Sequence, residues 1–201
     1  MDLSNVGMAL LRKGLGIVII RKARSADIDG VELIYDEIHQ AEEAGRLTTG
    51  WIKGVYPVRS TAYAALQRGD LFVLEDDREI RGAGIINQIQ VDVYADAQWK
   101  HSAPDREVCV LHTLVISPRF SGRGYGRGFV KFYEDHACRH GWTELRIDTN
   151  ERNLAARRMY HDLGYEEIGI VPTVFNNIPG VNLVLLEKNM SFQNKAVEGR
   201  S

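Results

Sequence analysis

Residues 108–165 read VCVLHTLVISPRFSGRGYGRGFVKFYEDHACRHGWTELRIDTNERNLAARRMYHDLGY, and this stretch decides the fold. Its apolar, β-branched start at 108–116 predicts a strand that is buried on both faces. A glycine-dense turn, SGRGYGRG, follows at 121–128. Apolar and aromatic residues at spacings of three and four then predict a helix. Such a strand, turn and helix start can form an anion site, because glycines let backbone N–H groups approach a phosphate and the helix N-terminus carries partial positive charge.

Two familiar phosphate loops do not fit this turn. A Walker loop requires a lysine after its glycines, and no lysine stands in that register. A dinucleotide fingerprint requires a third glycine after Gly122 and Gly124, but Arg127 occupies its place. A dinucleotide oxidoreductase is therefore disfavoured.

The run Ser-Gly-Arg-Gly-Tyr-Gly at 121–126 instead resembles the pyrophosphate loop of the GNAT superfamily of N-acetyltransferases. A second resemblance follows about thirty residues later, in Asn-Leu-Ala-Ala at 153–156, Met-Tyr at 159–160 and Leu-Gly-Tyr at 163–165. Two signatures in order are more specific than either alone. Ser121 departs from the family, which usually has Gln or Arg at this position.

The order of predicted elements is βααβββαβαββ, which is also the GNAT arrangement. It predicts an α/β (α+β) fold with a mixed, mostly antiparallel central sheet and helices on both faces. Residues 17–188 are predicted to form a single acyl-CoA N-acyltransferase domain. Residues 1–16 are expected to be an N-terminal arm or short helix, and residues 189–201 a mobile tail.

The composition limits the classes of partner. The chain has 201 residues and a formal net charge of -2, which gives no electrostatic case for nucleic acid or an anionic membrane. Without an 18-residue apolar stretch or a secretory signal, a cytoplasmic protein is expected. Two cysteines do not make a disulfide framework. The resemblance also allows a homodimer.

The resemblance implies acetyl-CoA as the donor and assigns residues to it. Backbone groups of the strand at Leu114, Val115 and Ile116 are expected to pair with its pantetheine arm. One backbone N–H there is expected to polarise the thioester carbonyl. The remaining cofactor residues come from the two signatures: Ser121, Gly122, Arg123, Gly124, Tyr125, Gly126, Arg127, Asn153 and Ala156. Asn153 is also a helix N-cap candidate, and the two arginines can equally be surface charges.

Three residues are candidates for chemistry. Tyr160 matches the aromatic residue of the second signature, which in many family members donates a proton to the departing thiolate; packing against the sheet is the alternative. A base must take a proton from the incoming ammonium. His112 is one candidate because it titrates near neutral pH, and Glu75 is a second. A water chain without a single essential base stays open.

The acceptor site is expected across the sheet from the cofactor. Its predicted lining is rich in aromatic side chains from two loops, although core packing explains these residues equally well: Trp51, Tyr56, Asn87, Tyr94 and Trp99. The loop at 92–107 is long enough to be functional. No residue is assigned to a metal.

The sequence thus predicts an acetyl-CoA-dependent N-acetyltransferase that transfers the acetyl group directly to a primary amine of a small molecule or peptide. Two alternatives stay open. One is a non-catalytic acyl-CoA-binding sensor, which Ser121 favours. The other is a protein or peptide N-terminal acetyltransferase, which requires an open acceptor groove.

Overall fold

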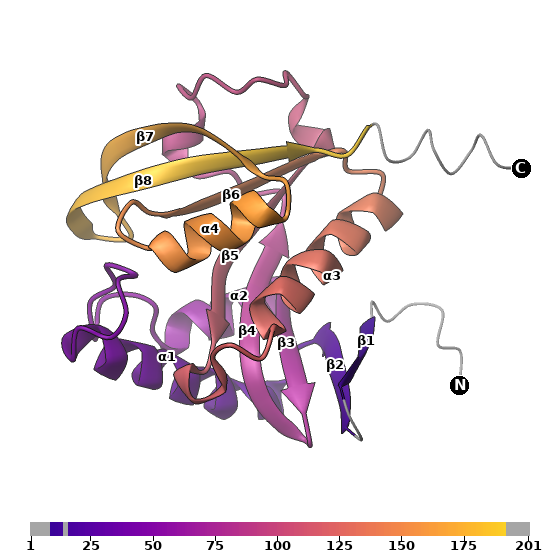
Figure 1. The fold of residues 1–201 in the computed structure, drawn as a ribbon, viewed down its shortest axis with the longest axis vertical. Helices are drawn as coiled ribbons and strands as arrows, with labels where there is room; N and C mark the ends of the chain where they lie inside the picture. Colours follow the sequence, from indigo (N-terminus) through magenta and orange to yellow (C-terminus); the bar gives the residue numbers. More distant parts are fainter. Residues whose placement is uncertain (1–8, 14–15, 192–201) are drawn as a thin grey trace, which may run out of the picture.

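A twisted mixed sheet forms the centre of the computed structural model, which describes residues 9–13 and 16–191. Within these residues the sheet has eight strands in the order β1-β2-β3-β4-β5-β6-β8-β7 (Figure 1). The strands are β1 (Ala9–Lys13), β2 (Gly16–Lys22), β3 (Leu71–Asp76), β4 (Glu79–Asn87), β5 (Val108–Ile116), β6 (Glu144–Asn150), β7 (Glu166–Phe175) and β8 (Ile178–Asn189). Every neighbouring pair is antiparallel except β5 and β6. The predicted mixed, mostly antiparallel sheet is confirmed.

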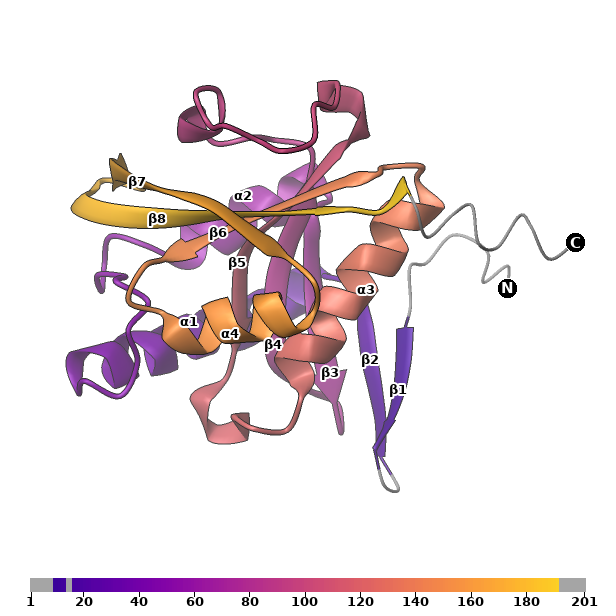
Figure 2. The ribbon, with the colours of Figure 1, turned by 45° about the horizontal axis from the view of Figure 1, so that its top comes forward.

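Four α-helices cover the two faces of the sheet in the described chain. They are α1 (Ile28–Glu43), α2 (Arg59–Arg68), α3 (Tyr125–Arg139) and α4 (Leu154–Asp162). Apolar residues of α1 and α2 pack with Val73, Ala83 and Val115 on one face. The helices α3 and α4 pack on the other face, where they lie side by side in both views (Figures 1 and 2). Because helices cover both faces of the sheet, the side chains on both sides of β3, β4 and β5 are buried. These strands therefore read as continuous apolar runs.

The N-terminal segment differs from its predicted form. Residues 9–13 form strand β1, which pairs with β2 in antiparallel register, so the expected arm or short helix is wrong there. The run Ala-Leu-Leu-Arg-Lys has no period that separates a helix from a strand, and the partner strand decides. At the other end, β8 continues to Asn189 and Met190 is buried, so the start of the expected tail belongs to the sheet. Residues 1–8 and 192–201 lie outside the described residues.

Close packing explains why position 84, in the centre of the sheet, is a glycine. A Cβ at Gly84 would lie 2.7 Å from Cε1 of Phe129, the aromatic that α3 places on β4. The register of β4 against β5 also shifts between Ala83 and Ile85. Gly84 therefore lets the helix α3 approach the strands that carry the site.

None of the helices in the described part of the chain combines the length and apolarity needed to cross a membrane.

Candidate functional site

The only parallel pair of strands in the described sheet separates after four residues. The register joins Val108 to Glu144 and ends where Leu111 meets Ile147. Beyond that point β6 stays paired with β8, and β5 stays paired with β4. Residues 112–116 of β5 therefore have a strand partner on one side only. Their other edge is available to a ligand that pairs as an added strand.

A bulge marks the same place on β5. Ile85 pairs with His112 and Ala83 with Val115, so one extra residue is accommodated on β5. Thr113 has φ of 49°, which is unfavourable for a β-branched residue. Its Oγ1 makes a short hydrogen bond with the hydroxyl of Tyr56. A bulge of this kind re-aims the backbone at the position where the strand edge is open.

A cavity of about 580 Å³ occupies the gap between the two strands. Its walls come from β5, β6, α2, α4, the start of α3, the loop at 49–56 and the β7–β8 hairpin. Of the predicted site residues, the cavity is lined by Trp51, Tyr56, Asn87, His112, Leu114, Ile116, Gly126, Asn153, Ala156 and Tyr160. The structure thus brings together residues that lie up to 109 positions apart, between Trp51 and Tyr160.

The glycine turn ends at the mouth of this cavity. Gly122 and Gly124 have φ of 75° and 80°, the left-handed region that favours glycine. Helix α3 begins at Tyr125, and Gly124 is its N-cap residue with no side chain to cap the first turn. The first N–H groups of an α-helix have no intrahelical partner, so the start of α3 is a place where an anion can bind. Gly126 lines the cavity, and a Cβ there would come within 3.1 Å of Sδ of Met159.

The other predicted cofactor residues divide into two groups. Leu114 and Ile116 line the cavity, whereas the side chain of Val115 is buried under α1 on the opposite face, as alternation along a strand requires. Arg123, Gly124, Tyr125 and Arg127 line a second cavity beside α3, which is more open to solvent. Arg127 forms an ion pair with Asp162 of α4, and Ser121 is exposed in the turn.

Helix α4 presents the second signature to the same cavity. Asn153 is the N-cap, and its Oδ1 accepts a hydrogen bond of 3.3 Å from the backbone N–H of Ala156. Both residues line the cavity. One turn later Tyr160 is 5% exposed and packs edge-on against Tyr165 at 5.9 Å between ring centroids. Burial, and then the nearby Asp148 carboxylate, raise the pKa of the Tyr160 phenol, which therefore stays protonated at neutral pH.

A carboxylate that the sequence did not single out lies in the cavity. Asp148 is on β6, directly after the point where β5 and β6 separate, and its Oδ2 accepts a 2.7 Å hydrogen bond from the hydroxyl of Tyr94. Burial raises the pKa of Asp148 to about 6, while the bond from Tyr94 acts in the opposite direction. Its charge also raises the pKa values of Tyr56 and Tyr160. A group that titrates near neutral pH inside a cavity is a candidate for proton transfer.

His112 lines the cavity but is poorly suited to be the base. Its Nε2 lies 2.9 Å from the carbonyl oxygen of Ile89 and 3.2 Å from Oδ1 of Asn87. Because the Ile89 carbonyl can only accept, Nε2 carries the proton. Burial lowers the pKa of His112 to about 4, so the ring is neutral and weakly basic at pH 7. Its contacts make it a positioning group for Asn87, which in turn donates to Asp70 at 2.8 Å.

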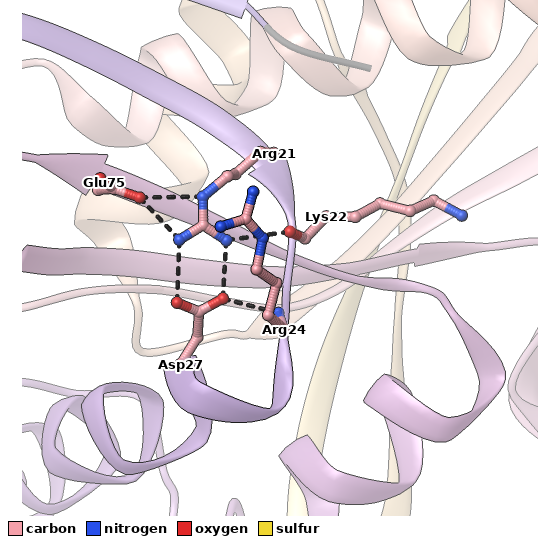
Figure 3. Close-up of polar contacts among 5 residues, drawn as sticks. All are labelled: Arg21, Lys22, Arg24, Asp27 and Glu75. Carbon is pink, nitrogen blue, oxygen red and sulfur yellow. Dashed lines mark hydrogen bonds and ion pairs between the residues drawn. The ribbon is translucent and has the colours of Figure 1, made fainter. Parts of the chain in front are cut away.

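Glu75 lies away from the cavity, which removes it as a candidate base. Figure 3 shows Arg21 of β2 between Glu75 of β3 and Asp27, the N-cap residue of α1. The ion pairs from Arg21 to Glu75 and to Asp27 each measure 2.7 Å. The side chain of Arg21 is only 12% exposed, so these contacts satisfy a largely buried guanidinium. Glu75 therefore helps to hold Arg21, which in turn binds Asp27 at the start of α1.

Replacing Glu75 with glutamine tests this assignment. The free energy of unfolding should fall by about 1–2 kcal/mol, because Arg21 keeps Asp27 but loses one charged partner. Urea denaturation measures this loss. The rate of the acetyl transfer that the sequence predicts, measured at saturating substrates, should stay within twofold of wild type, and a loss of about a hundredfold would restore Glu75 as a candidate base.

The predicted acceptor residues do not all reach the cavity. Trp51, Tyr56 and Asn87 line it, and Trp51 packs edge-on against Tyr56. Tyr94 is 2% exposed and packs with Val108 and Val110, and Trp99 donates its Nε1–H to the carbonyl oxygen of Tyr94 at 2.9 Å. Tyr94 and Trp99 do not line the cavity, so their assignment as acceptor-lining residues does not hold. Their place is taken by the β7–β8 hairpin, with Phe175, Asn176, Ile178 and Val181.

Neither cysteine belongs to this site. Cys109 is buried on β5 and Cys138 is exposed on α3, and neither lines the cavity. Burial raises the pKa of the Cys109 thiol, which keeps it protonated. A covalent cysteine intermediate is therefore disfavoured within the described residues.

Comparison with known proteins identifies the family. The sequence model of the acetyltransferase (GNAT) family matches residues 34–165. An uncharacterised N-acetyltransferase of Methanocaldococcus jannaschii is 29% identical over 79 residues, which are 39% of this chain and 35% of that protein. The match thus spans about a third of that relative's length.

Solved structures agree with this result at the level of the whole fold. A GNAT-family acetyltransferase from Streptococcus agalactiae superimposes with a TM-score of 0.72 and 25% identity, over 90% of this chain and 98% of that one. The yncA structure from Salmonella typhimurium, solved with acetyl-CoA, gives a TM-score of 0.63 and 18% identity over 87% of this chain and 94% of that one. The second similarity concerns the fold alone.

Proposed function

The chain belongs to the acetyltransferase (GNAT) family, and we propose that it transfers an acetyl group from acetyl-CoA directly to a primary amine of a small molecule. One observation carries the proposal. The open edge of β5, the N-terminus of α3 and the carboxylate of Asp148 all border one cavity. A donor and an acceptor bound there meet at fixed distance and orientation, which lowers the entropic cost of their reaction.

The residues present fit acetyl-CoA. The first turn of α3, which no side chain caps, and the two left-handed glycines before it suit a pyrophosphate, because backbone N–H groups at a helix N-terminus favour an anion. The single-sided edge at 112–116 suits the amides of a pantetheine arm. When bound, acetyl-CoA supplies a thioester, which is an activated acyl donor. The yncA structure, with a related fold, holds this molecule.

Asp148 is the proposed base. An amine bound in the cavity as an ammonium would be attracted by the carboxylate, which then accepts the proton that the nitrogen must lose before it attacks. A pKa of about 6 leaves Asp148 ionised at pH 7 and close enough to neutral for proton transfer. A backbone N–H of β5 beside the Thr113 bulge would stabilise the developing negative charge on the carbonyl oxygen.

The size and cover of the cavity favour a small acceptor over an extended peptide. A volume of about 580 Å³ has to hold the acyl end of the donor together with the acceptor. The loop at 49–56 and the β7–β8 hairpin contribute to its walls, with Trp51 and Phe175. Its lining is mainly apolar and aromatic, with the half-buried acid Asp148. A cationic amine with a short apolar body matches this combination.

A screen of primary amines tests the proposal. Release of free CoA thiol is followed with acetyl-CoA and a panel of small amines, amino acids and short peptides, and products are identified by mass spectrometry. Turnover of a small amine, with peptides at least tenfold poorer in kcat/KM, is the expected result. Tight acetyl-CoA binding without turnover would favour the sensor alternative, and a preference for peptides would favour an N-terminal acetyltransferase.

Replacing Tyr160 with phenylalanine should lower kcat about tenfold and leave the Kd for acetyl-CoA within about twofold. This loss in kcat is small for the removal of an acid–base group, because a thiolate can leave without first being protonated. Steady-state kinetics and calorimetry measure the two quantities. The matched control is Tyr63→Phe on the exposed face of α2, which should change neither. An unchanged kcat in Tyr160→Phe would leave Tyr160 with a packing role only.

A further inference from the structure

Three metal-ligating side chains converge at a place that the acetyl-transfer site does not use. His101 comes from the loop between β4 and β5, Glu144 begins β6, and Glu187 lies on β8. One ligand atom from each lies within 4.8 Å of the other two. None of the three lines the cavity at the β5–β6 separation. The loop that carries His101 runs above β8 in both ribbon views (Figures 1 and 2).

The two carboxylates are buried, and each is held by one oxygen only. Glu144 is 0% exposed and Glu187 is 1% exposed. Oε2 of Glu144 accepts from Nδ2 of Asn189 at 2.9 Å, and Oε1 of Glu187 accepts from the backbone N–H of Lys100 at 2.8 Å. The remaining oxygens, Oε1 of Glu144 and Oε2 of Glu187, are buried without a hydrogen-bond partner, as is Nδ1 of His101. Burying such atoms unpaired is costly.

The positive side chains nearby are engaged elsewhere. Arg146 bonds to Gln90 and lies over the ring of Trp99 at 3.9 Å, although its Nε has no partner. Lys100 directs its ammonium to Glu166 on the surface. Within the described residues, His101 is the only basic side chain in ion-pair range of either buried glutamate, at 3.6 Å from Oε1 of Glu187. The charge of Arg146 acts on both carboxylates, but within the described residues it forms no ion pair with either of them.

We propose that His101, Glu144 and Glu187 bind a divalent cation, with Zn²⁺ as the best chemical match. Two carboxylates can balance the double charge of one divalent ion, and the unpartnered Nδ1 of His101 offers a third ligand atom beside their unpartnered oxygens. Mixed nitrogen and oxygen ligands are typical of zinc. The bonds from Asn189 and from the Lys100 backbone orient each carboxylate through its other oxygen, as outer-shell donors do at metal sites.

The ion would fasten the loop at 88–107 to the ends of β6 and β8. That loop also carries Tyr94, whose hydroxyl donates to Asp148 in the cavity. A cation at this site therefore stabilises the loop and, through Tyr94, the position of the carboxylate. The role is structural, and the cation-binding step does not depend on the proposed acetyl transfer.

Zinc binding by the full-length chain, with any affinity tag removed, tests this site. After treatment with a chelator, Zn²⁺ is titrated against a competing chromophoric chelator, and thermal unfolding is followed with and without the ion. We expect one Zn²⁺ per chain and a rise in Tm on its addition. His101→Ala should weaken binding by at least about tenfold and abolish the rise in Tm, since even outer-shell losses cost that much.

The variants are chosen so that a loss of Zn²⁺ binding cannot be explained by misfolding. The side chain of His101 is 41% exposed, so its replacement should leave the fold intact by circular dichroism. Glu187→Gln tests the buried ligand. His161→Ala and Glu43→Gln, at exposed positions of other helices, are the controls and should bind as wild type does. Failure of the wild type to bind Zn²⁺, or equal binding by His101→Ala, would overturn the proposal.

Discussion

Replacing Asp148 with asparagine is expected to lower kcat/KM for the acceptor amine by about a hundredfold to a thousandfold. An amine at neutral pH is mostly ammonium, and the variant loses both the charge that attracts it and the group that takes its proton. The side chain keeps its shape, and its oxygen can still accept the hydrogen bond from Tyr94. The loss in kcat/KM therefore measures what the negative charge and the basicity of Asp148 contribute.

The pH profile makes this prediction specific. In the wild type, kcat/KM should rise through a pKa of about 6 as Asp148 ionises and then level off. The other titratable groups around the cavity do not produce this limb, because burial lowers the pKa of His112 to about 4 and raises that of Tyr56 to about 12. In Asp148→Asn the limb near pH 6 should disappear. A profile that keeps this limb would assign it to another group.

Stability separates this loss from misfolding. The pKa of Asp148 is raised on folding, so the folded state binds its proton more tightly than the unfolded state does. Its contribution to the free energy of unfolding therefore falls as pH rises from about 4 to about 6. Asp148→Asn should remove this dependence, and its Tm at pH 8 should be equal to or above that of wild type. Asp36→Asn on the exposed face of α1 is the control and should change neither rate nor Tm.

Replacing Gly124 with aspartate is expected to weaken acetyl-CoA binding about a hundredfold. Gly124 is the N-cap of α3 with φ of 80°, a conformation that Asp and Asn tolerate better than other side chains. A carboxylate there would occupy N–H groups of the first turn and repel the pyrophosphate. A repulsion of about 3 kcal/mol, reasonable for charges a few ångströms apart near a surface, gives this factor. Calorimetry on wild type and variant measures it.

Two controls separate charge from shape. Gly124→Asn places a neutral side chain of the same size at the same φ, so it should lose clearly less affinity than Gly124→Asp. Gly141→Asp adds the same charge at another left-handed glycine, with φ of 74° and nothing within 4 Å of a Cβ, and should bind normally. If Gly124→Asp binds acetyl-CoA as tightly as wild type, the glycine turn is not the pyrophosphate site.

The sequence predicted the parts of the fold that depend on local pattern. The apolar run at 108–116 is β5, the glycine turn leads into α3, and Asn153 caps α4. Each of these follows from neighbouring residues: alternation or continuity of apolar side chains, the left-handed preference of glycine, and the capping ability of asparagine. The strand β1 was missed because its structure depends on a partner strand, which no local pattern reveals.

The site was predictable only in part, for the same reason. The second signature predicts Tyr160 as a site residue, and Tyr160 lines the cavity. Asp148 sits in an ordinary strand sequence, and its raised pKa comes from burial by segments distant in the chain. Glu75 looked suitable at the end of a strand, yet Arg21 lies on the strand beside it. Tyr94 packs against Val108 in the core, and the ring of Trp99 lies against the guanidinium of Arg146, so neither residue faces the cavity. Contacts between distant segments decide which polar residues are structural and which face the cavity.

The short parallel pairing of β5 with β6 has one further consequence. The described sheet consists of two antiparallel parts, β1-β2-β3-β4-β5 and β6-β8-β7, joined along a seam of four residues, from Val108 to Leu111 on β5. A ligand seated beyond that seam touches both parts at once. Its binding energy therefore adds to the cohesion of the two halves, and by mass action the folded chain gains stability as the ligand concentration rises above its Kd. For this protein, ligand concentration and resistance to unfolding are therefore linked at the place where the two parts of the sheet separate.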